Sequence, residues 1–251
     1  MTNLRQQIST EEWGARTDLA AFFRLVAGYG WDDLLLAHIS ARLPDGSGYL
    51  VNPYGQIFSE VTASSILKVD FFGHRQMPSD FEISPEANVI HGAILESRPD
   101  INRVAHIHTV AGTAVSSQEN GLLNISQQSM IVHMSLAYHD YQGVVLDPAE
   151  GPDLQKSLGD KQHMIMRNHG LLAVGATVGK AFYALYNLQR SCEMQVASQG
   201  NDVHLITITD AIMERTRKMF GGHNVRNPET KDLLWEAKLR ELRQTSPDFE
   251  N

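Results

Sequence analysis

Two histidines separated by one residue are the first feature of this sequence that could carry out chemistry. They stand in the segment Ala105-His106-Ile107-His108-Thr109. In a β-strand, residues two positions apart project from the same face, so His106 and His108 can direct both imidazoles at one point. Neutral imidazole nitrogens bind Zn²⁺ at about 2.0–2.1 Å, and catalytic zinc sites usually have three protein ligands and one open position. The pair therefore favours a metal site.

A third ligand is offered by His169, in the segment Arg167-Asn168-His169-Gly170. We expect it at the end of a strand, where the glycine lets the backbone turn close to the site. A histidine pair alone is a weak signal, because two histidines on a strand face can also stack or bond backbone carbonyls. The residues alone leave both the metal site and this structural role open.

The elements that must position these histidines follow from capping residues and apolar spacing. Ser9 and Glu12 form a capping-box pattern that predicts a helix to about Tyr29. Extended pieces are predicted over Leu34–Arg42 and Gly48–Asn52, on either side of a turn.

Later in the chain, Ser84 as N-cap and Pro85 as the first helical residue predict a helix to about Glu96. Further predicted elements are strands at Arg103–Thr109, Met164–Asn168 and Leu171–Val174, a helix after Thr177 to about Ser198, and helices near 209–220 and 229–244. Strands that alternate with helices predict an α/β layered sandwich.

Length and composition favour one large domain. The 251 residues, 42% of them hydrophobic, are expected to form a single domain over 1–251, with a core over about 10–220 and C-terminal helices over 209–244. The net charge of -8, with both signs mixed along the chain, argues against nucleic-acid or anionic-membrane partners.

The single cysteine, Cys192, excludes an intrachain disulfide and has no activating pattern around it. No apolar run approaches the roughly 18–20 residues of a membrane span. We therefore expect a cytoplasmic protein.

Several ordered segments resemble the class II aldolase/adducin family. Three of them match the family pattern: Arg98-Pro99-Asp100, His106-Ile107-His108 and Asn168-His169-Gly170. Three others resemble its adducin-like branch: Asn52-Pro53-Tyr54-Gly55, Glu60-Val61-Thr62-Ala63-Ser64-Ser65, and Ala137-Tyr138-His139-Asp140-Tyr141 followed after one residue by Gly143. The resemblance covers about residues 10–220.

The resemblance implies a three-layer α/β/α sandwich around a central mixed or antiparallel sheet. It also implies a homotetramer with active sites at subunit interfaces. By position, His106, His108 and His169 would hold Zn²⁺ or another divalent transition metal such as Mn, Fe or Co. The ion would act as a Lewis acid and stabilise an enediolate when a carbon–carbon bond breaks. A glutamate near the metal would serve as ligand or general base.

This chain departs from the sugar-phosphate aldolases of the family at that glutamate. In those enzymes it lies four residues before the histidine that matches His91, and here that position is Ala87. Glu86 stands one residue earlier, which is a turn of about 100° on a helix. Glu86 is therefore either the catalytic carboxylate or an ordinary first-turn residue stabilised by the helix dipole. We predict for His91 a structural role, bonding a nearby loop.

The phosphate-binding residues of the family also differ here. The corresponding positions are Ala37-His38, Tyr54-Gly55 and Ser84-Pro85, which lack most of the donors. We therefore expect an unphosphorylated substrate, with His38, Tyr54 and His139 lining its pocket. For His38 and Tyr54 the alternative is ordinary packing in turns.

Two functions from different classes follow. The first is a metal-dependent lyase, an aldolase or decarboxylase, that acts on a small unphosphorylated hydroxy or oxo acid. The second is a non-catalytic module, similar to the head domain of adducin, that oligomerises and binds partners. A complete histidine triad favours the enzyme. A four-ligand structural zinc site is weaker, since it would need more cysteines than Cys192.

Overall fold

A seven-stranded mixed sheet forms the centre of the molecule in the computed structural model. The structure describes residues 4–200, 204–219 and 228–251, and in the last of these segments it describes side chains from residue 232 on. The strands are β1 (His38–Arg42), β2 (Tyr49–Val51), β3 (Leu67–Val69), β4 (Arg103–Ile107), β5 (Leu136–His139), β6 (His163–Met166) and β7 (Gly170–Gly175). Their order is β3-β2-β1-β4-β7-β6-β5, and every neighbouring pair is antiparallel except β5 and β6. The predicted α/β class is confirmed.

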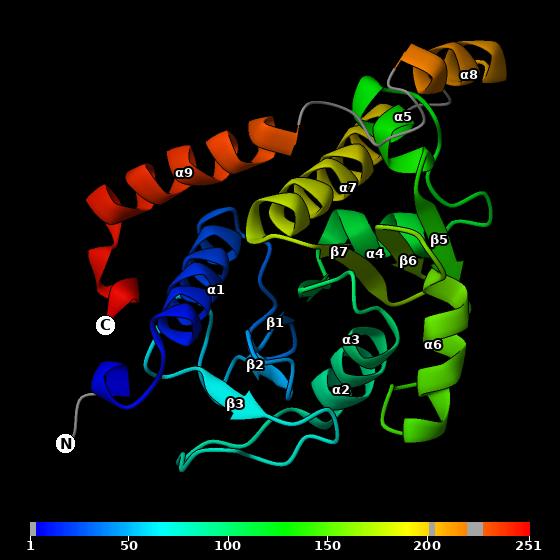
Figure 1. Cartoon of the computed structure of the whole chain (residues 1–251). Helices are drawn as coiled ribbons and strands as arrows, with labels where there is room; N and C mark the ends of the chain where they lie inside the picture. Colours follow the sequence, from blue (N-terminus) through cyan, green and yellow to red (C-terminus); the bar gives the residue numbers. More distant parts are fainter. Residues whose placement is uncertain (1–3, 201–203, 220–227) are drawn as a thin grey trace.

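Helices cover both faces of this sheet (Figure 1). One layer holds α1 (Thr10–Gly28), α4 (Val110–Ser116), α5 (Gln127–His133), α7 (Val178–Ser198) and α9 (Pro228–Thr245). The other holds α2 (Pro85–Ala87), the π-helical turn η2 (Asn88–Gly92), α3 (Ala93–Ser97) and α6 (Gly151–Leu158). Each layer buries its own hydrophobic cluster against the sheet. This is the expected three-layer sandwich.

The alternation of side chains along β1 and β4 separates the two layers. Ile39 and Ala105 point into the cluster beneath α1 and α7, whereas Val104 belongs to the cluster beneath α3. Residues two apart share a face, so His106 and His38 face the α2–α3 layer. They lie directly opposite each other in the β1–β4 register. The sheet therefore brings both imidazoles to one face.

Helix α1 begins as predicted, with a different role for Glu12. The Ser9 hydroxyl accepts a hydrogen bond from the backbone N–H of Glu12 at 3.1 Å. The Glu12 carboxylate does not return to Ser9, because it pairs with Arg16 at 3.0 Å and Lys68 at 2.8 Å. The reciprocal half of the predicted capping box is therefore absent.

Three strand predictions were too long. The predicted extended segment Leu34–Arg42 becomes a strand only at His38, because Leu34 has a φ of 49° and the chain turns there. Strand β4 ends at Ile107, so His108 follows the strand. Strand β6 ends at Met166, and the φ of 54° at Asn168 bends the chain before His169. These strand ends lie next to the predicted metal ligands.

The helix predicted after Ser84 is confirmed at its start, since the Ser84 hydroxyl caps the N–H of Ala87 at 3.3 Å. It then passes through the π-helical turn η2, which carries His91. Such turns occur frequently at functional sites. The helix ends at Ser97, one residue before Arg98.

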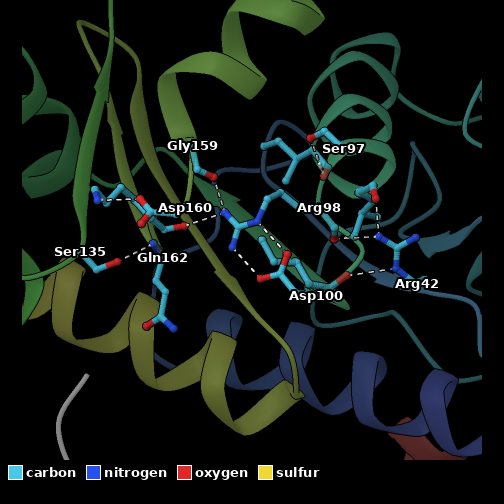
Figure 2. Close-up of polar contacts among 12 residues, drawn as sticks. Arg42, Ser97, Arg98, Asp100, Ser135, Gly159, Asp160 and Gln162 are labelled. Atoms are coloured by element: carbon cyan, nitrogen blue, oxygen red, sulfur yellow. Dashed lines mark hydrogen bonds and ion pairs between the residues drawn. The ribbon is translucent and has the colours of Figure 1, made fainter. Parts of the chain in front are cut away.

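The Arg98-Pro99-Asp100 segment connects the end of this helix to the loop that follows α6 (Figure 2). Arg98 pairs with Asp100 at 2.8 Å and donates to the backbone carbonyls of Gly159 and Lys161. Arg42, at the end of β1, donates to three carbonyls around the end of α3. This motif therefore has a structural role in the fold.

The C-terminal part follows the predicted pattern. The Thr177 hydroxyl caps α7, which runs to Ser198 as expected. Helix α8 spans Asp210–Met219, and the predicted end at residue 220 lies outside the described residues. Helix α9 ends at Thr245. None of the helices in the described residues is both long and apolar enough to cross a membrane.

Candidate metal centre

Three histidine side chains meet on the α2–α3 side of the sheet, at the ends of β4 and β7. The Nε2 atoms of His106 and His108 lie 2.7 Å apart, and those of His106 and His169 lie 3.2 Å apart. The Nε2 atoms of His108 and His169 are separated by 3.0 Å. In the described part of the chain, these three residues form the group of ligand-type side chains that could hold a metal ion. The structure thus brings the predicted triad together.

The outer nitrogens of two of these rings have defined partners. His106 Nδ1 lies 3.0 Å from the carbonyl oxygen of Leu171, which can only accept, so this nitrogen carries the proton. His108 Nδ1 lies 3.3 Å from the Asp33 carboxylate. Both partners place the lone pair on Nε2, at the centre of the triad. Metal-binding histidines are typically held by such outer partners.

The backbone around His169 is held in place by close contacts. The Thr113 hydroxyl donates to the carbonyl oxygen of His169 at 3.1 Å. The next residue, Gly170, packs against β4, where an added Cβ would lie 2.5 Å from the Ile107 carbonyl oxygen. Glycine is therefore required for the close approach of β7 to β4. The predicted turn at this glycine is not observed, because the chain bends at Asn168 and Gly170 already belongs to β7.

Burial keeps the triad neutral at physiological pH. Desolvation lowers the pKa of His106 well below its usual value and that of His169 to about 4. The pKa of His108 is also lowered by burial, although Asp33 opposes the effect. Metal binding needs neutral imidazoles, so the donor set is ready at neutral pH.

The geometry fits a divalent ion. The Nε2 lone pairs of His106 and His108 face each other at 2.7 Å and repel, and a cation between them removes the repulsion. A tetrahedral zinc site with Zn–N bonds of about 2.0–2.1 Å separates its nitrogens by roughly 3.3 Å. The observed separations of 2.7 Å to 3.2 Å need only a small outward movement of the rings.

Neither Glu86 nor Asp33 joins the histidines in the ligand group. Glu86 is half-buried in the first turn of α2 and accepts a hydrogen bond of 2.5 Å from the Ser84 hydroxyl. Its role as catalytic carboxylate stays a prediction. Asp33 was not predicted. It lies in the turn before β1, and no local pattern marks it as a partner of a histidine so distant in sequence.

The three predicted pocket residues differ in their surroundings. His38 is buried, and its ring centroid lies 5.0 Å from that of His106. Tyr54 is 45% exposed, and its backbone bridges Glu82. His139 is buried, with Nδ1 2.9 Å from the Ser157 hydroxyl and Nε2 3.1 Å from Glu150. Only His38 directly contacts the triad through its ring.

His91 has a different role from the predicted one. It was expected to bond a nearby loop, but both ring nitrogens contact side chains that are anchored on β1. Nε2 lies 2.7 Å from His38 Nδ1, and Nδ1 lies 2.5 Å from the Ser40 hydroxyl. All three residues are buried. The π-helical turn η2 places His91 directly over the strand, which sequence periodicity does not predict.

The lone cysteine takes no part in the site. Cys192 is fully buried in α7, and burial raises the pKa of its thiol to about 12. A thiol of this kind is neither a nucleophile nor a metal ligand at neutral pH.

Comparisons with known proteins identify the family of this chain. A model of the class II aldolase and adducin N-terminal domain matches residues 17–196. A Pseudomonas aeruginosa protein named "putative aldolase class 2 protein" is 45% identical over 250 residues, which are 98% of this chain and 96% of that protein. Alpha-adducin of Rattus norvegicus is 40% identical over 200 residues, covering 77% of this chain and 27% of adducin.

A solved structure has nearly the same fold over the whole chain. The crystal structure of an aldolase II superfamily protein from Pseudomonas syringae superposes with a TM-score of 0.92 at 37% identity, covering 99% of each chain. L-fuculose 1-phosphate aldolase from Glaciozyma antarctica reaches a TM-score of 0.83 at 22% identity, over 100% of this chain and 95% of that chain. The second likeness concerns the fold alone.

Proposed function

Because this chain belongs to the class II aldolase/adducin family, we propose that it is a divalent-metal-dependent lyase that cleaves a carbon–carbon bond in a small unphosphorylated hydroxy or oxo acid. The observation that carries the proposal is the convergence of three Nε2 atoms within 2.7 Å to 3.2 Å. A fold does not need three histidines from distant segments at one point, and the facing Nε2 lone pairs of His106 and His108 would destabilise it.

The chain's own residues would hold and neutralise the reacting groups. His106, His108 and His169 would bind the ion, with Zn²⁺ as the first candidate and Mn, Fe or Co as alternatives. The bound ion would polarise a substrate oxygen and stabilise the negative charge that develops as the bond breaks. His38, on the neighbouring strand, would orient the substrate beside the triad.

Glu86 is our candidate for the residue that moves the proton. Its carboxylate is half-buried at the start of α2 and is held by the Ser84 hydroxyl. Carboxylates are among the side chains that serve as general bases. The Ser84 hydroxyl is occupied by this contact and by its capping role.

Because the Ser84 hydroxyl is already engaged within the protein, we favour an unphosphorylated substrate. Ser84 stands where sugar-phosphate aldolases have a phosphate donor, and in this chain Ser84 Oγ already has an internal partner. Tyr54 is exposed and would reach a ligand only at the rim. His139 would contribute by packing near His169, since both of its ring nitrogens are engaged.

We also propose a homotetramer with active sites at subunit interfaces. Large apolar side chains are exposed on the two segments that flank His108. Leu34 is 75% exposed, Leu36 54% and Val110 89%. Exposed apolar groups beside a functional site are typical of an interface. Sedimentation equilibrium should give a mass near four times the 28.0 kDa of one chain, and a monomer would refute this assembly.

A substrate screen tests the lyase directly. Zinc- or manganese-loaded protein should release an aldehyde, a ketone or CO₂ from some member of a panel of C3–C6 hydroxy and oxo acids. His169→Ala should abolish that release, since it removes one ligand. The alternative function, a non-catalytic oligomerisation and binding module, predicts no turnover of any panel member by the loaded protein.

A further inference from the structure

A chain of three buried side chains leads from the interior of the sheet to the metal centre. Ser40 Oγ lies 2.5 Å from His91 Nδ1, and His91 Nε2 lies 2.7 Å from His38 Nδ1. The exposed fractions are 0% for Ser40, 0% for His91 and 2% for His38. Each imidazole nitrogen can donate or accept according to its tautomer, so the direction of these two bonds decides what His38 offers to a ligand.

The protonation state of His91 limits the possible directions of these two hydrogen bonds. His91 is fully buried, and desolvation lowers its pKa to about 3, so it is neutral at physiological pH. A neutral imidazole carries one proton on one of its two nitrogens. Only two arrangements of the chain are therefore possible, and they run in opposite directions.

In the first arrangement, the Ser40 hydroxyl donates to His91 Nδ1, and His91 Nε2–H donates to His38 Nδ1. In the second, His38 Nδ1–H donates to His91 Nε2, and His91 Nδ1–H donates to Ser40 Oγ. The hydroxyl hydrogen of Ser40 would then need an acceptor of its own. In the described part of the chain, the Ser40 side chain contacts no polar group other than His91. A buried donor without an acceptor costs about 1–3 kcal/mol.

We propose that the Ser40–His91–His38 chain fixes the proton of His38 on Nε2 and so makes this neutral histidine a hydrogen-bond donor to a substrate oxygen. The inference rests on the proposed function and adds a specificity element to it. His38 would not be a base or a fourth metal ligand, since both need the lone pair of Nε2. Ser40 and His91 are positioning residues that act through His38.

The position of His38 supports this assignment. It lies opposite His106 in the β1–β4 register, with ring centroids 5.0 Å apart. The described residues provide no hydrogen-bond partner for its Nε2, although Nδ1 is occupied. His38 also does not join the group of side chains that could hold the ion. Its free N–H is therefore available to a ligand bound at the triad.

The chemistry of the ligand follows from this donor. A neutral N–H recognises an oxygen acceptor and is most effective toward one that carries negative charge. The substrate should therefore present a carboxylate oxygen, or an oxygen that becomes negative during the reaction, beside the atom held at the metal. A 2-hydroxy or 2-oxo acid has these two oxygens on adjacent carbons, which narrows the proposed substrate class to such acids.

Neutron diffraction from a crystal of the full chain exchanged into D₂O tests the inference. Deuterium should be found on His38 Nε2, on His91 Nε2, and on Ser40 Oγ in the direction of His91 Nδ1. Deuterium on His38 Nδ1 or His91 Nδ1 would overturn the proposal. This readout does not depend on activity, so it separates failure of the inference from failure of the lyase assignment.

A binding measurement adds a second readout. The probe is oxalate, a small dicarboxylate that can bind an ion and still present an oxygen to His38. In the zinc-loaded protein, Ser40→Ala should weaken oxalate binding by about 10-fold to 100-fold, because His91 is no longer held in one tautomer. Ser40→Thr retains the hydroxyl and should therefore bind oxalate with the affinity of the parent protein. Unchanged oxalate affinity in a folded Ser40→Ala protein would contradict the proposal.

Discussion

The Asp33 carboxylate lies 3.3 Å from His108 Nδ1 and connects the turn before β1 to the end of β4. This contact fixes the ring of His108 with Nε2 at the centre of the triad. Outer partners of this kind typically change metal affinity by 10-fold to 100-fold when removed. Asp33→Ala should therefore raise the dissociation constant for Zn²⁺ by about that factor, as measured by competition with a chelating dye.

The neighbouring residue provides the control for this prediction. Asp32 is also half-buried, and the described residues offer it no ion pair or hydrogen bond through its side chain. Asp32→Ala changes the local charge by the same amount, so its zinc affinity should stay within about twofold of the parent. Equal effects of the two substitutions would show that Asp33 acts only through its charge.

Glu86 gives a prediction about turnover. If Glu86 moves the proton, Glu86→Gln should lower kcat by about 10²-fold to 10⁴-fold, the usual contribution of a general acid or base. The zinc content should not change, because the ligand group contains histidines only. Glu96→Gln, on the exposed surface of α3, serves as the matched control. An unchanged kcat would remove Glu86 from the mechanism.

The close packing of Gly170 against β4 gives a prediction about protein stability and zinc binding. An added Cβ would lie 2.5 Å from the Ile107 carbonyl oxygen and 2.9 Å from the His108 ring. Gly170→Ala should therefore displace His108 and lower both the melting temperature and the zinc stoichiometry. Gly14→Ala is the control, since nothing lies within 4 Å of its Cβ position in α1. It should raise helix stability by up to about 1 kcal/mol.

Burial of histidines predicts how the stability of the metal-free protein depends on pH. Folding lowers the pKa of His91 to about 3 and that of His169 to about 4. Below about pH 6.5 these histidines become protonated in the unfolded chain but stay neutral in the folded chain. The free energy of unfolding therefore decreases as the pH falls. Each such histidine contributes about 1.4 kcal/mol per pH unit.

Urea unfolding between pH 6.5 and 4.5 measures that slope. His91→Asn should reduce it by about 1.4 kcal/mol per pH unit, whatever the absolute stability of the variant. His74→Asn is the control, because the His74 side chain is 76% exposed. An unaltered slope in His91→Asn would mean that His91 titrates normally in the folded protein.

Much of the fold could be predicted from local signals. The caps at Ser9, Ser84 and Thr177 start α1, α2 and α7 where the sequence indicates, because each hydroxyl satisfies a backbone N–H in its own first turn. Strand ends were less predictable. The positive φ angles of Leu34 and Asn168 depend on tertiary contacts, which override the β propensity of their neighbours.

The metal triad could be predicted because its signal is local and its position in the family pattern is specific. His106 and His108 are two residues apart, and His169 stands before a glycine. The side chains that contact the outer nitrogens of the histidines could not be predicted in this way. Asp33 reaches His108 only through a turn, and His91 reaches Ser40 only because a π-helical turn shifts the helix over β1. Contacts between segments distant in sequence leave no periodic pattern.

The central claim is that three histidines bind one divalent metal ion, and elemental analysis of tag-free protein tests it most directly. The parent protein, incubated with Zn²⁺ or Mn²⁺ and freed of excess, should contain about one equivalent of metal per chain. His106→Ala/His108→Ala should contain almost none, because one ligand cannot hold the ion. Absence of metal from the parent protein, or an equal content in the variant, would contradict the account and favour the non-catalytic binding module.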